Sequence, residues 1–171
     1  DWFYDSVIYV VGNGLMEGKG DCCFAPNSKL TRAELVTVLY RMAGEASVEG
    51  KTHPFEDVTA NAWYAEAVTW AYNAGVVEGM SGTAFAPGRD ISREQIALIL
   101  FRYSGAEKVE ENALKAYTDA SSISNYAVDA MNWAVATGLI NGTTTTTLAP
   151  RKTALRAQAA TILMRYCEAM N

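Results

Sequence analysis

The chain has few of the residues on which most catalytic and metal sites depend. Its 171 residues include one histidine, His53, and three cysteines, Cys22, Cys23 and Cys167. A structural zinc site needs several such ligands at short, fixed spacings, and these four residues do not provide them. The sequence also has no Ser/His/Asp, Cys/His or phosphate-loop pattern. We therefore expect no enzyme activity, no catalytic residues, no metal and no cofactor.

Basic residues are too few for a surface that binds nucleic acid. The 14 lysines and arginines are outnumbered by 19 acidic residues, which gives a net charge of −5 and an isoelectric point near 4.9. Such a chain has no cationic surplus with which to neutralise phosphates. Its apolar runs are also shorter than the roughly 20 residues that span a bilayer. We expect neither nucleic-acid binding nor membrane insertion.

Three copies of one pattern run through the chain. In each copy a glycine precedes a proline by eight residues, the proline precedes an arginine by six, and a second arginine follows nine later. The motifs are GLMEG, FAP and TRAE (14–34), then GVVEG, FAP and SREQ (75–95), then GLING, LAP and LRAQ (138–158). Offsets of 61 and 63 residues indicate one supersecondary unit, repeated because a single copy is too small to bury its apolar face.

The second copy predicts a helix, a loop and a second helix. Apolar residues recur with a helical period over 63–74, and Gly75 follows where a left-handed cap favours glycine. Ser92 with Gln95 three residues later predicts a capping box at the start of the second helix, which Gly105 ends. Thr31 with Glu34 predicts the same box in the first copy. The linker 106–116 is expected to be partly helical.

Short linkers favour one compact cluster of repeats with a shared core. Such a cluster hides its own apolar faces, so we expect a monomer.

The cysteines are interpreted as packing residues or surface thiols. A Cys23–Cys167 disulfide is an alternative if the first and last repeats are neighbours. The chain opens inside a repeat, so we expect it to be a fragment of a longer protein, and the lack of a visible signal peptide says little about export.

These motifs resemble the S-layer homology (SLH) repeat, in which an F-x-D-V segment precedes W-Y-x-x-A-V, a glycine pair, F-x-P and T-R-A-E. The resemblance extends over essentially the whole chain. It implies a mainly α fold, with three helix-loop-helix repeats about a pseudo-threefold axis and a central helix bundle. The repeats would span 1–44, 55–105 and 117–171, and the first lacks the leading segment that begins at Phe55 in the second.

The resemblance also implies a function. SLH repeats anchor proteins non-covalently to the bacterial cell wall, so this chain would lie at the extracellular surface. Its partner would be an acidic secondary cell-wall polysaccharide, typically pyruvylated, or a peptidoglycan-linked glycan, held in grooves between repeats. Carried over by motif, the glycan-binding residues are Arg32, Arg93, Arg156, Asp57, Asp119, Trp63, Glu34, Gln95 and Gln158.

The residue types fit an acidic glycan. A cation opposes the helix dipole in a first turn, yet all three copies place an arginine there. A guanidinium grips a carboxylate with two parallel hydrogen bonds, and the unpaired amides of a helix N-terminus also attract anions. Aspartate accepts hydrogen bonds from sugar hydroxyls, and tryptophan packs on a sugar ring. We accordingly expect Arg93→Ala to weaken glycan binding while leaving the melting curve nearly unchanged.

Structural roles are alternatives at each position. Helix capping accounts for Thr31, Ser92, Glu34, Gln95 and Gln158. Arg41, Arg102 and Arg165 complement a helix dipole or pair with an acid of their helix, and Trp70, Trp133 and Tyr9 pack between helices. The first-turn arginines are either ligand contacts or solvated side chains. Asp57 and Asp119 are either ligand contacts or residues of an N-cap or turn before the first helix of their repeat.

The copies also depart from the family pattern. The first has no counterpart of Asp57, and the third has Leu155 at the capping position and Tyr126 where the second has Trp63.

Two other functions compete with anchoring. A glycan hydrolase requires two carboxylates at a specific separation, which nothing in the sequence encodes. A helical-repeat scaffold for protein partners is the stronger alternative.

Overall fold

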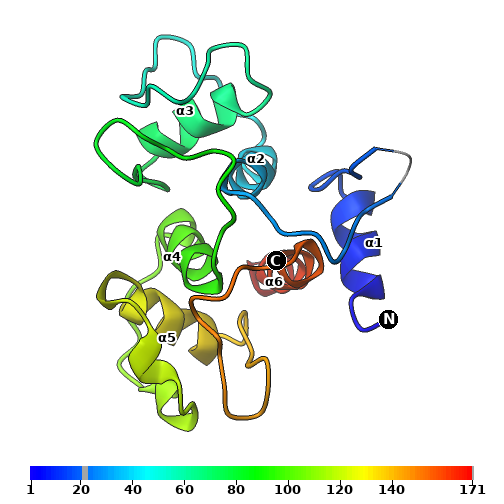
Figure 1. The fold of residues 1–171 in the computed structure, drawn as a ribbon, viewed down its shortest axis with the longest axis vertical. Coiled ribbons are helices and arrows are strands. Elements are labelled where there is room, and N and C mark those ends of the chain that lie inside the picture. Colours follow the sequence, from blue (N-terminus) through cyan, green and yellow to red (C-terminus); the bar gives the residue numbers. More distant parts are fainter. Residues whose placement is uncertain (21–22, 171) are drawn as a thin grey trace.

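The computed structural model describes residues 1–20 and 23–170 and is mainly helical, as predicted (Figure 1). Its α-helices are α1 (Tyr4–Gly12), α2 (Arg32–Met42), α3 (Ala65–Asn73), α4 (Arg93–Ser104), α5 (Val128–Ala136) and α6 (Arg156–Met170). Three 3₁₀ turns, η1 (Ala113–Ala116), η2 (Ala120–Ser122) and η3 (Asn125–Ala127), lie between α4 and α5. None of the helices in the described ranges is both long and apolar enough to cross a membrane.

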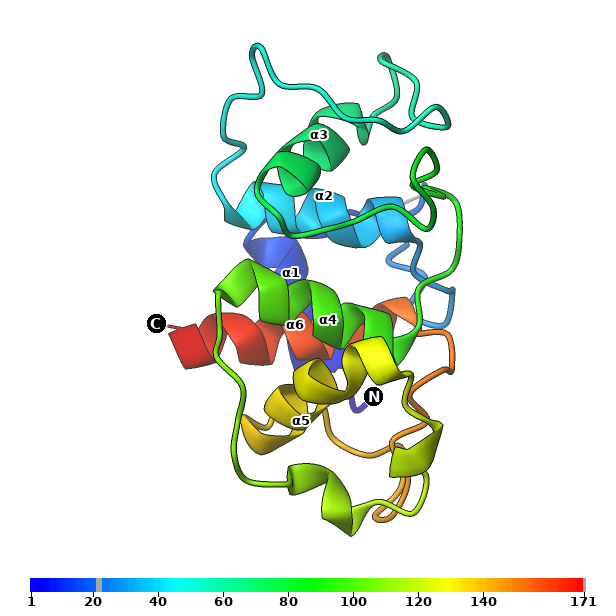
Figure 2. The same ribbon diagram turned by 90° about the vertical axis from the view of Figure 1, so that its left-hand side faces the viewer.

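The second helix of each repeat lies at the centre and the first lies outside it. Viewed along the bundle, α2, α4 and α6 surround the middle of the molecule, and α1, α3 and α5 form three lobes around them (Figure 1). From the side, α2, α4 and α6 lie between α3 and α5 (Figure 2). Each outer helix packs on the central helix of the preceding repeat: α3 on α2, α5 on α4, and α1 on α6. The central bundle, the shared core and the contact between first and last repeats are therefore confirmed.

A closed triangle of backbone hydrogen bonds marks the pseudo-threefold axis. The Leu30 amide donates to Ala154 O at 3.0 Å, the Ala154 amide to Ile91 O at 2.9 Å, and the Ile91 amide to Leu30 O at 2.9 Å. All three residues are completely buried. Because each repeat both donates and accepts once, no repeat can leave this ring without exposing backbone groups of the other two.

The central helices begin against loops of the next repeat. At the start of α2, the amides of Arg32 and Ala33 donate to Arg89 O and Pro87 O. At α4, the amides of Arg93 and Glu94 donate to Lys152 O and Pro150 O, and at α6 those of Arg156 and Ala157 donate to Ser28 O and Pro26 O. The first amides of each helix, which lack partners within the helix, are thus satisfied between repeats.

Local signals in the sequence placed most helix ends correctly. Both predicted capping boxes form: Thr31 and Ser92 accept from the amides of Glu34 and Gln95, whose side chains accept in return. Gly105 caps α4 in a left-handed conformation, φ 62°. The helix expected over 63–74 begins two residues later, because Trp63 and Tyr64 form a turn that directs the Trp63 ring outward. In the linker expected to be partly helical, only η1 forms.

The expected packing role of the large aromatic residues is confirmed. Trp70 and Trp133 are buried, with rings against Tyr40 and Phe101 respectively, and Tyr9 is partly buried against the same core. Cys23 is exposed and Cys167 is half-buried, and both are free thiols, so the Cys23–Cys167 alternative is wrong. Cys22 lies outside the described residues.

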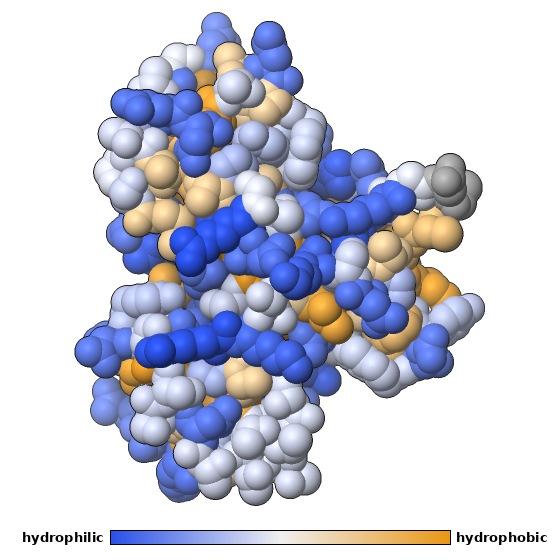
Figure 3. All heavy atoms as spheres, in the orientation of Figure 1, coloured by the Kyte–Doolittle hydropathy of each residue, from blue (hydrophilic) through white to orange (hydrophobic). Residues whose placement is uncertain are grey.

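On the face seen along the bundle axis, hydrophilic side chains cross the middle of the molecule (Figure 3).

Candidate functional site

The three first-turn arginines are buried and link neighbouring repeats. Arg32 donates from Nε to Phe85 O at 2.9 Å and from Nη2 to Glu78 O at 3.2 Å. Arg93 makes the same bonds to Leu148 O at 2.8 Å and Asn141 O at 2.7 Å. Arg156 closes the circle by donating to Phe24 O and Glu17 O in the first repeat. Each guanidinium therefore holds the glycine loop and the F/L-A-P turn of the next repeat.

These contacts correct two parts of the sequence interpretation. Only 3–5 % of each arginine is exposed, so the alternative of solvated side chains is wrong. The helix N-termini are also not open anion sites, because carbonyl oxygens already occupy their first amides. Burial lowers the pKa of Arg32 and of Arg93, although arginine stays charged. The guanidinium carbons of Arg32 and Arg156 lie 4.7 Å from the ring centres of Phe85 and Phe24.

Asp57 and Asp119 hold the F/L-A-P turns of their own repeats. The Asp57 carboxylate accepts from the amides of Phe85 at 2.8 Å and Ala86 at 2.7 Å. Asp119 accepts from the amides of Leu148 at 2.9 Å and Ala149 at 2.8 Å. Burial raises the pKa of Asp119, but the hydrogen bonds from both amides and the charge of Arg93 outweigh it and leave this pKa below its usual value. Both aspartates therefore have a structural role, but at the F/L-A-P turn after the first helix of the repeat and not, as the sequence suggested, at a cap or turn before that helix.

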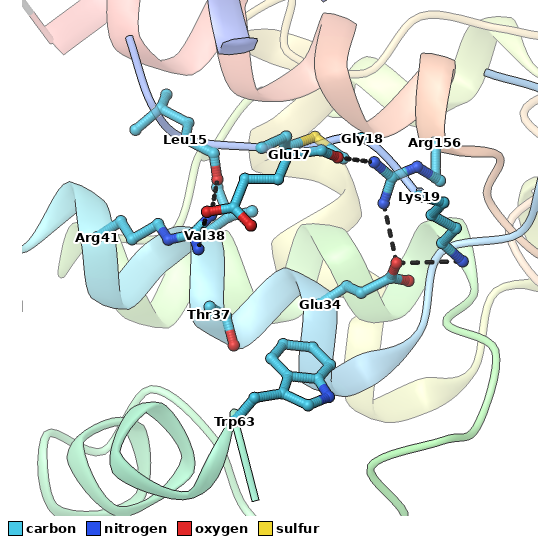
Figure 4. Close-up of a pocket in the computed structure, with 11 residues that line it drawn as sticks. Leu15, Glu17, Gly18, Lys19, Glu34, Thr37, Val38, Arg41, Trp63 and Arg156 are labelled. Atoms are coloured by element: carbon cyan, nitrogen blue, oxygen red, sulfur yellow. Dashed lines mark hydrogen bonds and ion pairs between the residues drawn. The ribbon is translucent and has the colours of Figure 1, made fainter. Parts of the chain in front are cut away.

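One groove, called groove 1, lies between the first two repeats (Figure 4). Its walls come from the glycine loop of the first repeat, one side of α2, the ring of Trp63 and the guanidinium of Arg156. Trp63 is 65 % exposed, so one face of its indole is open to solvent. Groove 1 thus brings together three residues predicted from the sequence: Trp63, Glu34 and Arg156.

Groove 1 contains paired charges. Glu34 Oε1 lies 2.8 Å from Arg156 Nη1 and 3.2 Å from Lys19 Nζ, while Glu34 Oε2 accepts from the Thr31 amide at 2.7 Å. Burial raises the pKa of Glu34, but the Thr31 amide and the two cations together bring this pKa below its usual value. Arg41 pairs with Glu17 at 2.7 Å, so it bridges to the glycine loop rather than to an acid of its own helix.

A second feature of groove 1 is an unpaired hydroxyl. Thr37 Oγ1 is the one buried side-chain nitrogen or oxygen without a hydrogen-bond partner among the residues described. Thr37 lies on α2 between Glu34 and Arg41, on the side that faces Trp63 (Figure 4). A buried hydroxyl left unpaired costs stability unless a ligand or water satisfies it, so this position is a candidate contact.

The equivalent groove 2 lies between the second and third repeats. It is lined by the glycine loop 77–80, the α4 residues Gln95, Leu98, Ile99 and Arg102, the ring of Tyr126, and Arg32. Arg102 pairs with Glu78 at 3.2 Å. Tyr126 occupies the place of Trp63 and is 57 % exposed. Groove 2 brings together the predicted residues Arg32 and Gln95.

Other predicted residues lie apart from these two grooves. Asp57 and Asp119 lie at their turns and line neither groove. Arg93 and Gln158 belong to the third interface, where Gln158 Oε1 accepts from the Leu155 amide at 3.1 Å and Arg165 Nη1 donates to Leu139 O at 3.4 Å. Because the buried Arg93 side chain donates to two carbonyls of the third repeat, the expectation that Arg93→Ala leaves the melting curve unchanged loses its basis.

Sequence reasoning missed several residues that line the grooves. Arg41 and Arg102 were assigned to helix stabilisation, although their constant spacing from the first-turn arginine was a signal that they share a site. Tyr126 aligned with Trp63 but was not counted with it. Lys19 has no counterpart in the other copies, and Thr37 recurs as Thr161 in the third copy alone, so the repeat gave little signal for either residue. In the described ranges, no group of three acidic, histidine or cysteine side chains is arranged to hold a metal.

Comparison with known proteins assigns the sequence to a family. The model of the S-layer homology domain matches residues 1–36, 54–97 and 116–160. The chain is 32 % identical to the amylopullulanase of Thermoanaerobacterium thermosulfurigenes, over 98 % of its length and 9 % of the relative's. It is 32 % identical to the surface-layer 125 kDa protein of Lysinibacillus sphaericus, over 96 % of its length and 14 % of the relative's. The chain thus spans a small part of these relatives.

Proposed function

Because this chain belongs to the S-layer homology family, we propose that its inter-repeat grooves bind an acidic, pyruvylated secondary cell-wall polysaccharide. Membership itself makes the chain a cell-wall anchoring module at the cell surface, and the S-layer homology domain is not catalytic. The finer proposal concerns which polymer is bound, and where. We also propose that the chain is a monomer and that it retains a longer protein at the cell wall.

The observation that carries the proposal is the composition of the two grooves. Each combines an arginine at its base, a second arginine on the central helix and an exposed aromatic ring on the opposite wall. The aromatic ring packs on the apolar face of a sugar, and the guanidinium attracts a carboxylate such as that of a pyruvate ketal. This combination occurs twice at equivalent places. A polymer that occupies both grooves would therefore be held more tightly than a polymer that occupies one of them.

A sedimentation experiment with purified cell-wall sacculi tests the proposal. Sacculi are used before and after mild acid treatment, which removes secondary polysaccharide and ketal groups. Untreated sacculi should retain the protein, and treated sacculi should not. Trp63→Ala removes an exposed ring and should weaken binding with little effect on stability. Ile8→Ala removes an exposed apolar side chain that lines neither groove, so it controls for the loss of apolar surface alone.

Each outcome has a distinct meaning. Retention that survives acid treatment contradicts a secondary-polysaccharide target and moves the ligand to peptidoglycan itself. A failure of untreated sacculi to retain the protein contradicts the proposal. In that case a protein partner, as in the scaffold alternative, becomes the hypothesis to pursue.

A further inference from the structure

The charges of the chain are unevenly distributed. Three segments, 25–34, 86–95 and 149–158, run from the F/L-A-P turn into a central helix, and they hold seven of the 14 basic residues and three of the 19 acidic residues. They carry a net charge of +4, whereas the rest of the chain, with seven basic and 16 acidic residues, carries −9. A region of one sign on a molecule of the opposite sign directs charged ligands to that region.

The three segments meet at one end of the central bundle, where α2, α4 and α6 begin (Figure 2). They contain the hydrogen-bonded ring of Leu30, Ile91 and Ala154. Four exposed cations lie within three residues of this ring: Lys29, Arg89, Arg151 and Lys152. We call this end of the bundle the axial face. Hydrophilic side chains cross its middle (Figure 3).

The acidic residues of the three segments are committed to other contacts. Glu34 lies in groove 1, where it pairs with Arg156 at 2.8 Å. Glu94 is buried, with 3 % of its surface exposed, and accepts hydrogen bonds from the outer part of the third repeat. Asp90 pairs with Lys29 at 2.7 Å. None of these three acids is therefore left to neutralise the other exposed cations of the axial face.

Three of the axial cations have no acidic partner. Arg89, Arg151 and Lys152 make no ion pair among residues 1–20 and 23–170. Burial is the main cause that lowers the pKa of the nearby Arg32, and the charge of Arg89 is the second, so like charges repel one another here. The cations also lie beyond the N-terminal ends of the central helices, where the helix dipoles disfavour positive charge. The stability of the fold therefore does not explain their position.

The axial face also lacks rings on which a sugar could pack. None of the large apolar or aromatic side chains that are exposed in the described ranges belongs to the three segments. Grooves 1 and 2, by contrast, present the rings of Trp63 and Tyr126. The axial face therefore offers charge without stacking. A phosphodiester chain suits it, because such a chain places a negative charge on every unit and needs no ring contact.

We propose that the axial face binds a linear polyanion with closely spaced phosphate groups, such as a phosphodiester polymer of the cell wall, through Lys29, Arg89, Arg151 and Lys152. None of these four residues lines groove 1 or groove 2, so the site is separate from the grooves and goes beyond the proposed function. Each cation neutralises a phosphate and releases the counterion held there. Binding therefore weakens steeply as the salt concentration rises.

Titration with fluorophore-labelled linear polyphosphate tests the inference. Fluorescence anisotropy gives the association constant at a series of salt concentrations. For the native chain, the logarithm of this constant should fall against the logarithm of the salt concentration with a slope of about −3, since each of four contacts contributes about −0.7. The axial variant, Arg89→Ala with Lys152→Ala, keeps the carbonyls that accept from α2 and α4. It should bind about tenfold or more weakly at low salt, with a slope of about −1.5.

A matched variant removes the same charge elsewhere. Lys51→Ala with Lys115→Ala takes one exposed cation from the linker after α2 and one from η1. It should bind polyphosphate nearly as the native chain does. Melting curves establish that both variants are folded. The melting temperature of the axial variant should equal or exceed that of the native chain, because the substitutions relieve repulsion between like charges.

Four results would overturn the inference. The first two are a native chain that does not bind polyphosphate at low salt, and equal affinities of the axial and matched variants. The third is a greater loss of affinity in Trp63→Ala than in the axial variant, which would move the polymer to groove 1. The fourth is tighter binding of a single-stranded oligonucleotide with the same number of phosphates. That result would indicate stacking of bases and hence a nucleic-acid ligand.

Discussion

At the residue scale, Asp57 and Asp119 each stabilise a turn with an unfavourable backbone conformation. The central alanine of the F/L-A-P motif has a positive φ in all three repeats: 53° at Ala25, 59° at Ala86 and 50° at Ala149. A non-glycine residue in this region costs about 1–2 kcal/mol. In the second and third repeats the aspartate offsets this cost, because its carboxylate accepts hydrogen bonds from the alanine amide and the amide before it.

Replacement of Asp57 should therefore reduce stability. Asp57→Ala removes a charged acceptor from two amides, so we expect the free energy of unfolding to fall by about 2–3 kcal/mol. Urea denaturation followed by circular dichroism measures this change. Glu56→Gln, an exposed neighbour, is the control and should stay within about 0.5 kcal/mol of the native value. An equally stable Asp57→Ala that no longer binds sacculi would show that Asp57 serves the ligand alone.

Glu34 makes stability depend on pH in the acid range. Its folded-state pKa lies below the ordinary value of 4.5, so between these values the unfolded chain binds more protons than the folded one. The stabilisation is complete above about pH 4.5 and is lost as the pH falls through the folded-state pKa. Melting temperatures measured from neutral to acid pH should decline below this point. Glu34→Gln should show a shallower decline, and an identical decline would contradict this contribution.

At the element scale, the loops after α3 and α5 each depend on one glycine. A Cβ on Gly79 would contact Ser81 O and lie 2.7 Å from Ala84 O, and one on Gly142 would contact Thr144 O and lie 2.8 Å from Thr147 O. These are backbone atoms, which cannot move aside as a flexible side chain would. The second glycine of the motif is required because the loop folds back closely on itself. The same loop carries the carbonyl that accepts from the buried arginine.

Gly79→Ala should accordingly distort the loop beside groove 2. We expect a loss of about 2 kcal/mol or more in the free energy of unfolding, since the added methyl overpacks a backbone contact. Gly82→Ala is the matched control, because no atom lies within 4 Å of its added Cβ. Thermal melts of both variants distinguish the two effects. Similar melting temperatures would mean that the loop adapts without cost.

Much of this architecture could be predicted at the element scale, because its signals are local. The capping boxes at Thr31 and Ser92 and the glycine at 105 are short-range patterns, and the structure has them. The partners of the first-turn arginines were not predictable from spacing. Arg32 bonds to carbonyls 46 and 53 residues away, and a backbone carbonyl has no sequence signature. An arginine that opposes a helix dipole indicated a partner, but its position left open whether that partner was a ligand or the protein itself.

At the scale of the whole molecule, the repeats form a closed ring rather than an open array. In open repeat proteins each unit contacts its neighbours along the chain and the end units have one free face. Here the last repeat returns to the first through three sets of contacts: α6 against α1, the Leu30–Ala154 hydrogen bond, and the Arg156 guanidinium. We infer that the three repeats unfold together as one cooperative unit, because loss of any one exposes buried polar groups in both others.

Arg93→Ala tests this closure at one interface. The truncation leaves Leu148 O and Asn141 O without their donor and removes a buried cation, so the free energy of unfolding should fall by about 3 kcal/mol. Arg93→Lys keeps the charge but lacks the planar fork that reaches both carbonyls, and it should recover only part of the loss. Arg151→Ala, an exposed arginine nearby, should change stability by less than about 0.5 kcal/mol. Urea unfolding monitored by both tryptophan fluorescence and far-ultraviolet circular dichroism gives these values. Coincident transitions in Arg93→Ala indicate that the weakened ring still unfolds as a unit, whereas native stability in this variant would show that the arginine does not hold the repeats together.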